Sequence, residues 1–187
     1  MLDKSKPVDP RVIRTHQLLT DALMELLKEK PFGAVTVRDI VERATLNRTT
    51  FYTHFEDKYA LLNYMIGEKF QVLLAEQLPT CPRFCEDHLR LLVITTAEFL
   101  AQFATQCQPN NFHQSSPPIE FYIHQHLYQV VCSWIEPDSN PVLASVISWG
   151  IWGTAFQWVR RKERMSPAVL ADQVVPLIVS GVHPYFG

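Results

Sequence analysis

Apolar residues recur at intervals of three and four along almost the whole chain, and no useful stretch alternates between apolar and polar positions. Because an α-helix turns once in about 3.6 residues, this pattern predicts an all-α protein. A first helix is expected to begin at Asp9-Pro10, an N-cap followed by a proline in the first turn, and to end before Pro31. Its predicted apolar face comprises Ile13, Leu19, Leu23, Leu26 and Leu27.

Two short helices are predicted next, in close succession. The first opens at Thr36, and Asp39 completes the sequence pattern of a capping box three residues later. It breaks near Thr45, and Asn47 is the next N-cap, for a short helix that runs through Thr53. Two short helices joined by a brief turn are typical of a helix-turn-helix, whose second helix lies in the major groove of DNA.

The remainder of the chain also shows helical periodicity. We expect one helix after Asp57 that ends at Pro79, and others over residues 83–106, 119–135, 141–164 and 166–182, with a polar loop at residues 108–118. Residues 139–159 carry no charge, but they contain too many small and polar residues for a membrane-spanning helix. We therefore interpret them as a buried or inter-subunit helix and expect no membrane partner.

The second short helix of the predicted helix-turn-helix offers chemistry suited to reading DNA. Threonine presents a hydroxyl to several base edges and a methyl group to thymine, and arginine pairs with guanine or a phosphate. Phe51 and Phe55 are four residues apart, so they are expected to face the core and to turn the polar set outward. That polar set is Asn47, Arg48, Thr49, Thr50, Tyr52, Thr53 and His54.

The string T-x-x-x-I-x-x-x-A followed by N-x-T-x-F-Y-x-H-F-x-x-K runs from Thr36 to Lys58 and resembles the DNA-binding domain of the TetR family of bacterial transcriptional regulators. The resemblance covers residues 9–64, about one third of the chain. It implies a three-helix helix-turn-helix domain over residues 1–57 and a larger helical ligand-binding and dimerisation domain over residues 58–187. It also implies contacts to bases or phosphates from Thr36, Asn47, Arg48, Thr49, Thr50, Tyr52, His54 and Lys58.

One position departs from the family pattern. The family usually has glycine in the turn where this chain has Thr45. If that residue adopts a left-handed conformation, a β-branched side chain there is strained. The resemblance therefore predicts the two helices more firmly than the turn between them.

Overall charge argues against nucleic acid as the partner. The chain has 17 basic and 19 acidic side chains, a net charge of −2, whereas a basic domain is the usual footprint of DNA binding. Ten basic and nine acidic side chains fall between Met1 and Lys58, so the excess is small there as well. The basic residues at the amino end form either a phosphate-contacting arm or an ordinary solvated surface, and the sequence leaves both open: Lys4, Lys6, Arg11 and Arg14.

The resemblance also implies that the later helices dimerise through the last two long ones and hold an effector. Small and aromatic residues of the uncharged helix suit a close helix–helix interface, namely Trp149, Gly150, Gly153 and Phe156. A pocket for a small apolar or aromatic effector is expected among Phe99, Phe103, Phe121, His124, Tyr128 and Trp152. For both sets, packing within the core of one subunit is the alternative.

Cysteine usage indicates a reduced environment. No apolar stretch follows the leading charges, so no secretory signal is expected, and a cytoplasmic protein with free thiols is the default. Cys81, Cys85 and His88 share a helical face and would make a soft metal set, but Pro82 interrupts them and no fourth ligand is evident. No metal, cofactor or enzymatic activity is therefore predicted.

The sequence as a whole predicts a cytoplasmic, homodimeric DNA-binding regulator. We expect a repressor that binds a palindromic operator of double-stranded DNA and is released by a small-molecule effector. The alternatives are control by a partner protein or by thiol or metal sensing, and a helical ligand-binding module that does not bind DNA.

Overall fold

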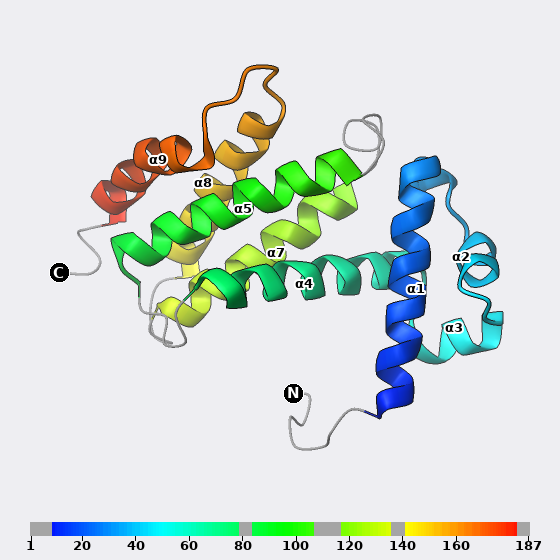
Figure 1. The fold of residues 1–187 in the computed structure, drawn as a ribbon. Coiled ribbons are helices and arrows are strands. Elements are labelled where there is room, and N and C mark those ends of the chain that lie inside the picture. The colour runs from blue at the N-terminus through cyan, green and yellow to red at the C-terminus, as the bar shows by residue number, and fades with distance from the viewer. Residues whose placement is uncertain (1–8, 79–83, 107–116, 136–140, 183–187) are drawn as a thin grey trace. The chain divides into compact units, whose positions relative to one another are not determined.

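The structure, a computed structural model, describes residues 9–78, 84–106, 117–135 and 141–182 (Figure 1). Over these residues it contains eight α-helices, one 3₁₀ turn and no strand, so the all-α prediction is confirmed. The elements are α1 Pro10–Glu29, η1 Phe32–Ala34, α2 Val37–Arg43, α3 Arg48–His54, α4 Lys58–Gln77, α5 Glu86–Gln106, α7 Pro117–Trp134, α8 Pro141–Val159 and α9 Pro167–Val182.

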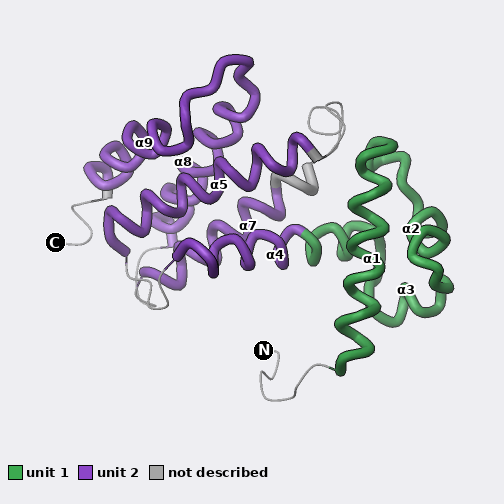
Figure 2. The backbone as a smooth tube through the Cα atoms, viewed as in Figure 1, with its two compact units in different colours: residues 1–65, 106–116 green, residues 66–105, 117–187 purple. Residues whose placement is uncertain are grey.

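The chain divides into two compact units (Figure 2). The first comprises residues 1–65 and 106–116, and the second comprises residues 66–105 and 117–187. The division falls inside α4, between Met65 and Ile66, so this helix supplies residues to both units. The boundary expected from the sequence, after residue 57, lies at the start of the same helix.

The first unit packs α2 and α3 against α1. Four of the five predicted apolar residues of α1 are buried, but Ile13 is 56% exposed. The prediction for Ile13 was wrong because the buried residues of α1 begin only at Leu19, so its first turns extend beyond the core. The other elements add to this core Phe32, Val35, Ile40, Val41, Phe51, Phe55, Leu61 and Leu62.

Side-chain caps begin the helices of the first unit, and the cap at Asp9 was predicted from the sequence. Asp9 Oδ1 accepts a hydrogen bond from Arg11 N at 2.9 Å at the start of α1. At the start of α4, Asp57 Oδ1 accepts from the amides of Tyr59 and Ala60 at 2.9 and 2.8 Å. A cap satisfies amides that have no partner inside the helix, and each one fixes where its helix begins.

The turn between α2 and α3 is a Schellman motif with a threonine in its left-handed position. Leu46 N donates to Val41 O at 2.9 Å and Thr45 N to Glu42 O at 3.3 Å, the two hydrogen bonds that define the motif. Thr45 has a φ of 55°, and among the described residues it is the only one other than glycine with a positive φ. The strain predicted for Thr45 is therefore present, and for an L-residue it costs about 1–2 kcal/mol.

The second unit packs α5, α7, α8 and α9 with the carboxyl-terminal part of α4. The fully buried residues of α5 include Leu92, Thr96 and Leu100. Pairing with α7 and α9 buries one side of α8. By length and composition α8 is apolar enough to cross a membrane, but 44% of it is buried in this unit, as in the core helix of a globular domain.

Helix ends differ from the sequence-based expectation in three places. α5 begins at Glu86, not at residue 83, and α7 begins at Pro117, inside the predicted loop, whose other residues lie largely outside the described ones. α8 was predicted to continue to Arg164 but ends at Val159. There Arg161 N donates to Trp158 O at 3.2 Å, a bond that tightens the chain into a turn.

Candidate nucleic-acid interface

The outward face of α3 carries four exposed side chains around a buried aromatic anchor. Phe51 is fully buried in the core of the first unit, as predicted from its spacing with Phe55. The exposed residues follow a spacing of one, three and one positions, which places them on one side of the helix: Arg48, Thr49, Tyr52 and Thr53. α3 therefore presents a guanidinium, hydroxyl groups and a phenol to the outside.

Most of these polar groups remain available to a ligand. Within the described residues, Arg48 makes no ion pair and the Thr49 hydroxyl makes no hydrogen bond. Tyr52 is 58% exposed, and its ring stands edge-on to Phe51 with centroids 5.4 Å apart. Thr53 differs, because its Oγ donates to Thr49 O at 2.9 Å and leaves chiefly its methyl group and lone pairs to the outside.

Three of the predicted DNA contacts use their polar atoms to build the motif. Asn47 Oδ1 accepts from Thr50 N at 2.7 Å and from Thr50 Oγ at 2.9 Å, which caps α3. Thr36 caps α2 and donates both its amide and its hydroxyl to Asp39 Oδ2, each at 2.8 Å. The hydroxyl protons of Thr36 and Thr50 are thus already engaged, while the side-chain amide of Asn47 can still donate.

The predicted capping box is confirmed, and it is anchored to the end of α1. Lys30, the C-cap of α1, donates from Nζ to Asp39 Oδ2 at 2.7 Å. The Lys30 ammonium, together with the hydrogen bonds from Thr36, holds the pKa of Asp39 well below its usual range. The carboxylate therefore stays ionised at the amino end of α2, where the helix dipole also favours negative charge.

Lys58 lies at the start of α4 with its ammonium on the backbone of η1. Its Nζ donates to the carbonyl oxygens of Phe32, Gly33 and Val35 at 3.0, 3.2 and 2.7 Å. It also lies 4.8 Å from the centroid of the Phe32 ring, and burial lowers the pKa of Lys58. Because all three ammonium protons are engaged, the phosphate contact implied by the family resemblance would require Lys58 to release a carbonyl.

His54, the last residue of α3, joins an aromatic cluster rather than the outward face. Its ring stands edge-on to that of His16 on α1, with centroids 5.1 Å apart. His16 also contacts Phe55 at 4.8 Å and Tyr64 at 4.7 Å. Burial, with a smaller contribution from the charge of His54, lowers the pKa of His16. The cluster ties the end of α3 to both α1 and α4.

Few other cations of the first unit lack a carboxylate partner. Arg38 pairs with Glu42 at 2.6 Å, and Arg43 bridges Glu25 and Glu29 at 3.2 and 2.9 Å. Within the described part of this unit, the exposed cations without an ion pair are Arg11, Arg14, Lys28 and Arg48. Arg11 and Arg14 belong to the basic amino end singled out in the sequence, whereas Lys4 and Lys6 lie outside the described residues.

The residues expected to line an effector pocket do not share one environment. Phe99 and Phe103 stack on each other in the core of the second unit, and Trp152 is buried there too. Phe121, by contrast, is 59% exposed. His124 is half-buried, stacks on Trp149 with centroids 3.9 Å apart and has its Nε2 3.2 Å from Ser148 Oγ. Tyr128, half-buried on α7, forms a hydrogen bond with Cys132 that raises the pKa of Tyr128.

The residues expected at a dimer interface are more accessible. Trp149 is 57% exposed, and an added Cβ at Gly153 would meet no atom within 4 Å. At Gly150 the same atom would lie 3.7 Å from Ile178 of α9, an ordinary contact. Phe156 is half-buried and stacks on Trp152 at 5.3 Å.

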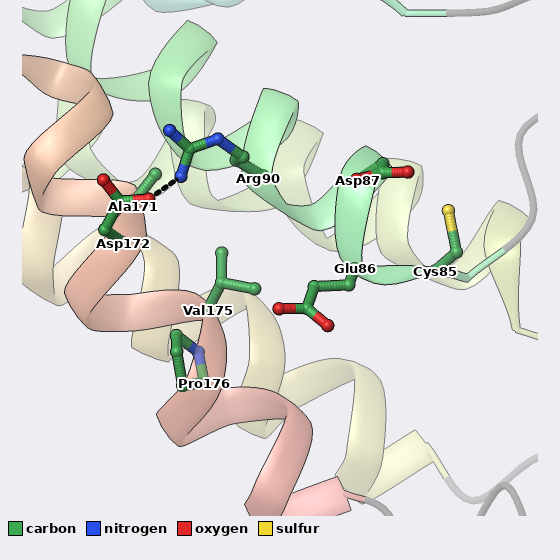
Figure 3. Close-up of a pocket in the computed structure, with 8 residues that line it drawn as sticks. All are labelled: Cys85, Glu86, Asp87, Arg90, Ala171, Asp172, Val175 and Pro176. Atoms are coloured by element: carbon green, nitrogen blue, oxygen red, sulfur yellow. Dashed lines mark hydrogen bonds and ion pairs between the residues drawn. The ribbon is translucent and has the colours of Figure 1, made fainter.

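A cavity of about 420 Å³ opens between the first turns of α5 and the middle of α9 (Figure 3). Arg90 reaches across it from α5 and pairs with Asp172 of α9. Sequence reasoning missed this cavity because its two walls, separated by about eighty positions, carry no shared motif. Its lining comprises Cys85, Glu86, Asp87, Arg90, Ala171, Asp172, Val175 and Pro176, and none of the expected pocket residues.

The possible cysteine and histidine metal set is not assembled in the described residues. Cys85 is a free, exposed thiol, and Cys81 lies outside the described residues. Within those residues, no group of three histidine, cysteine or acidic side chains could hold a metal ion. His88 instead lies against the ring of Trp134, with centroids 6.1 Å apart.

Comparisons with known proteins agree with the architecture of the first unit. The family model described as bacterial regulatory proteins, tetR family, matches residues 19–65. The uncharacterized HTH-type transcriptional regulator YxbF of Bacillus subtilis (strain 168) is 38% identical over 65 residues, which are 34% of this chain and 17% of that protein. The matches span only 17–33% of the length of the curated relatives.

Solved structures share the fold over nearly the whole chain. Lin0861 from Listeria innocua superposes with a TM-score of 0.66 at 17% identity and covers 96% of this chain and 95% of that one. FadR from Bacillus subtilis, solved in complex with stearoyl-CoA, gives a TM-score of 0.55 at 20% identity and covers 90% of this chain and all of that one.

The helix-turn-helix of the first unit matches a family of bacterial regulatory proteins, and the helices of the chain share the fold of the solved structures. Residues 19–65 thus match the TetR family of bacterial regulatory proteins, as the sequence resemblance implied for this part of the chain.

Proposed function

We propose that this chain is a cytoplasmic transcriptional repressor that binds a palindromic DNA operator as a homodimer. The observation that carries the proposal is the outward face of α3, where Arg48, Thr49 and Tyr52 surround the buried Phe51. A short helix with these groups at its amino end fits the major groove, where arginine and threonine reach base edges.

Hydrogen bonding suggests a division of labour among the proposed contacts. Arg48 and Thr49, which have no partner of their own in the described residues, read bases, and the phenol of Tyr52 donates to a phosphate. Arg11 and Arg14 supply further phosphate contacts from the amino end of α1. Instead of the DNA contacts implied by the resemblance, we assign a positioning role to five residues that hold the reading helix in place, namely Thr36, Asn47, Thr50, His54 and Lys58.

An exposed apolar face on α8 and α9 supports the homodimer. Val142, Val146 and Trp149 lie on one side of α8, and each is more than half exposed. The half-exposed Gly150 and Gly153 continue that side, and Val169 and Leu177 of α9 are exposed as well. Monomers rarely leave such a face in water, and a second copy would cover it by a two-fold axis that matches a palindrome.

We extend the proposal to a small apolar or aromatic effector held by the second unit. The buried rings of Phe99, Phe103 and Trp152 give this unit an aromatic interior. FadR, a structural neighbour, was solved with stearoyl-CoA bound, so this fold holds a ligand with a long acyl chain in at least one protein. An effector that binds one arrangement of the dimer better than another shifts the population and thereby changes operator affinity.

Selection of bound duplexes from a random DNA pool tests the proposal. The wild-type chain should enrich a palindrome whose half-sites are spaced by about one helical turn or a multiple. Thr49→Val keeps the side-chain shape but removes the hydroxyl, and it should change the enriched sequence. Thr15→Val is the matched control, because the Thr15 hydroxyl donates to Arg11 O at 2.9 Å inside α1. No enrichment of any duplex would refute DNA binding.

Sedimentation tests the dimer. Gly153→Glu places a charge on the exposed side of α8, where nothing lies within 4 Å of the added Cβ, so the subunit should fold but not dimerise. Gln102→Glu, on an exposed position of α5, is the control and should leave the dimer intact. An intact Gly153→Glu dimer would refute the proposed interface. Transcription from a promoter that carries the enriched palindrome should fall when the chain is present, and a rise would refute the repressor role.

A further inference from the structure

We infer that Thr45, in the turn before α3, donates its hydroxyl to a phosphate oxygen of the operator. This inference rests on the proposed DNA binding and adds a contact that the family resemblance did not imply. Three observations carry it: the strained backbone of Thr45, its unpartnered hydroxyl and its place beside the reading helix.

The backbone of the turn does not require a threonine. The φ of 55° at Thr45 completes the Schellman motif, and both hydrogen bonds of that motif join backbone atoms. Glycine adopts this conformation without strain, and asparagine adopts it at lower cost than a β-branched residue. The side chain of Thr45 therefore makes the turn less stable than glycine would.

The side chain of Thr45 makes no hydrogen bond within the described part of the first unit that compensates for that strain. The side chain of Thr45 is exposed, and its hydroxyl makes no hydrogen bond there. Other threonines of this unit donate to a carbonyl or carboxylate oxygen, namely Thr15, Thr20, Thr36, Thr50 and Thr53. Besides Thr45, only Thr49 among the threonines of this unit has a hydroxyl that donates no hydrogen bond within the described residues, and Thr49 lies on the outward face of α3. An exposed donor on a strained residue is typical of a binding site.

The position of Thr45 brings it within reach of DNA once α3 is in the groove. It lies two residues before Asn47, the N-cap of α3, so the two Cα atoms are at most about 7 Å apart. The amino-terminal residues of a reading helix are the ones that meet the bases, and the flanking backbone faces the phosphates. A neutral hydroxyl at the edge of the motif therefore fits a phosphate oxygen better than a base edge.

Three substitutions in the full chain separate the hydroxyl from the backbone. Thr45→Ser keeps the hydroxyl, Thr45→Ala removes it but keeps a Cβ in the left-handed conformation, and Thr45→Gly removes both the hydroxyl and the strain. Operator affinity, measured by fluorescence anisotropy on the duplex that the wild type selects, should stay within about twofold for serine. It should weaken by about tenfold or more for alanine and for glycine, the effect of two lost hydrogen bonds, one in each half-site of the dimer.

Thermal unfolding and phosphate ethylation complete the test. Thr45→Gly should unfold at a higher temperature than the wild type although it binds DNA more weakly. Ethylation of one phosphate per half-site should interfere with the wild type and with serine but not with alanine or glycine. Wild-type affinity for the alanine variant, or equal weakening for serine and alanine, would overturn the inference. If the wild type itself binds no duplex, it is the proposed function that fails.

Discussion

Gly67, in the middle of α4, lies where a side chain of α7 comes closest to its backbone. A Cβ atom on residue 67 would lie 2.6 Å from both Cε1 and Nε2 of His126. Carbon atoms in contact are normally about 3.5–4 Å apart, so Gly67→Ala would force the ring to retreat by about 1 Å. This glycine is therefore expected to be required by packing, although glycine weakens a helix.

The size of the effect follows from two opposing contributions to the free energy of unfolding. Alanine in place of glycine inside a helix stabilises by about 1 kcal/mol. Forcing an extra carbon into a packed contact costs about 1–3 kcal/mol. Gly67→Ala is therefore expected to leave the protein less stable by up to roughly 2 kcal/mol. Without the ring, in a His126→Ala background, the same change should stabilise it by about 1 kcal/mol.

Urea unfolding of the full chain at one protein concentration measures both values, since a dimer's stability depends on concentration. The four proteins form a double-mutant cycle with an expected coupling of about 1–3 kcal/mol. Gly181→Ala is the matched control, because its Cβ would meet nothing within 4 Å, and it should not couple to His126. If Gly67→Ala stabilises both backgrounds equally, the ring is not held against α4 and the reasoning is refuted.

Three further predictions concern the first unit. Lys58→Met leaves three carbonyls without their donor and should lower the free energy of unfolding, measured in urea, by roughly 2–3 kcal/mol. The same change should leave the dependence of operator affinity on salt concentration unaltered. A salt dependence reduced by about one ion would instead place Lys58 on a phosphate. The pKa of Asp39 is lowered in the folded protein, so its carboxylate stabilises the fold at pH values above the ordinary pKa of about 3.9. The difference in urea midpoint between the wild type and Asp39→Asn should therefore narrow as pH falls below about 4. A difference that stays constant over this range would contradict the prediction. Burial lowers the pKa of His16 below 6.5 in the folded protein, so the wild type should lose stability as pH falls through about 6.5. His16→Phe should lose less stability than the wild type between about pH 7 and 5. An equal loss in the two proteins would count against a buried neutral ring at this position.

Sequence reasoning succeeded where the decisive interaction spans only a few residues. The caps of α1, α2 and α3 are hydrogen bonds between residues two or three positions apart, so the sequence alone predicts them from Asp9, Thr36 and Asn47. The inward turn of Phe51 follows equally from helical spacing with Phe55. The departure from the family's glycine at Thr45 predicted strain if the residue were left-handed, and its φ of 55° meets that condition.

It failed where the outcome depends on what packs alongside. Ile13 has the right spacing for the core, but it is 56% exposed because the fully buried residues of α1 begin only at Leu19. The exposure of Phe121 and the cavity between α5 and α9 depend on helix pairings that the local pattern does not contain. The engagement of Lys58 with η1 joins residues 23–26 positions apart, so the sequence offered only the family's phosphate contact for this lysine.

The candidate interface shows why residue type alone cannot separate recognition from construction. Threonine, asparagine and lysine are suited to DNA, but they are equally suited to capping helices and holding carbonyls. A hydroxyl has one proton to donate, so Thr36, Thr50 and Thr53, whose protons are used inside the fold, have little left to offer a ligand. Thr45 and Thr49 retain theirs, and one of them does so at the expense of backbone strain. Of the eight contacts implied by the resemblance, Arg48, Thr49 and Tyr52 have polar groups that are free to bind DNA. Thr45, which the resemblance does not include, has a free hydroxyl as well.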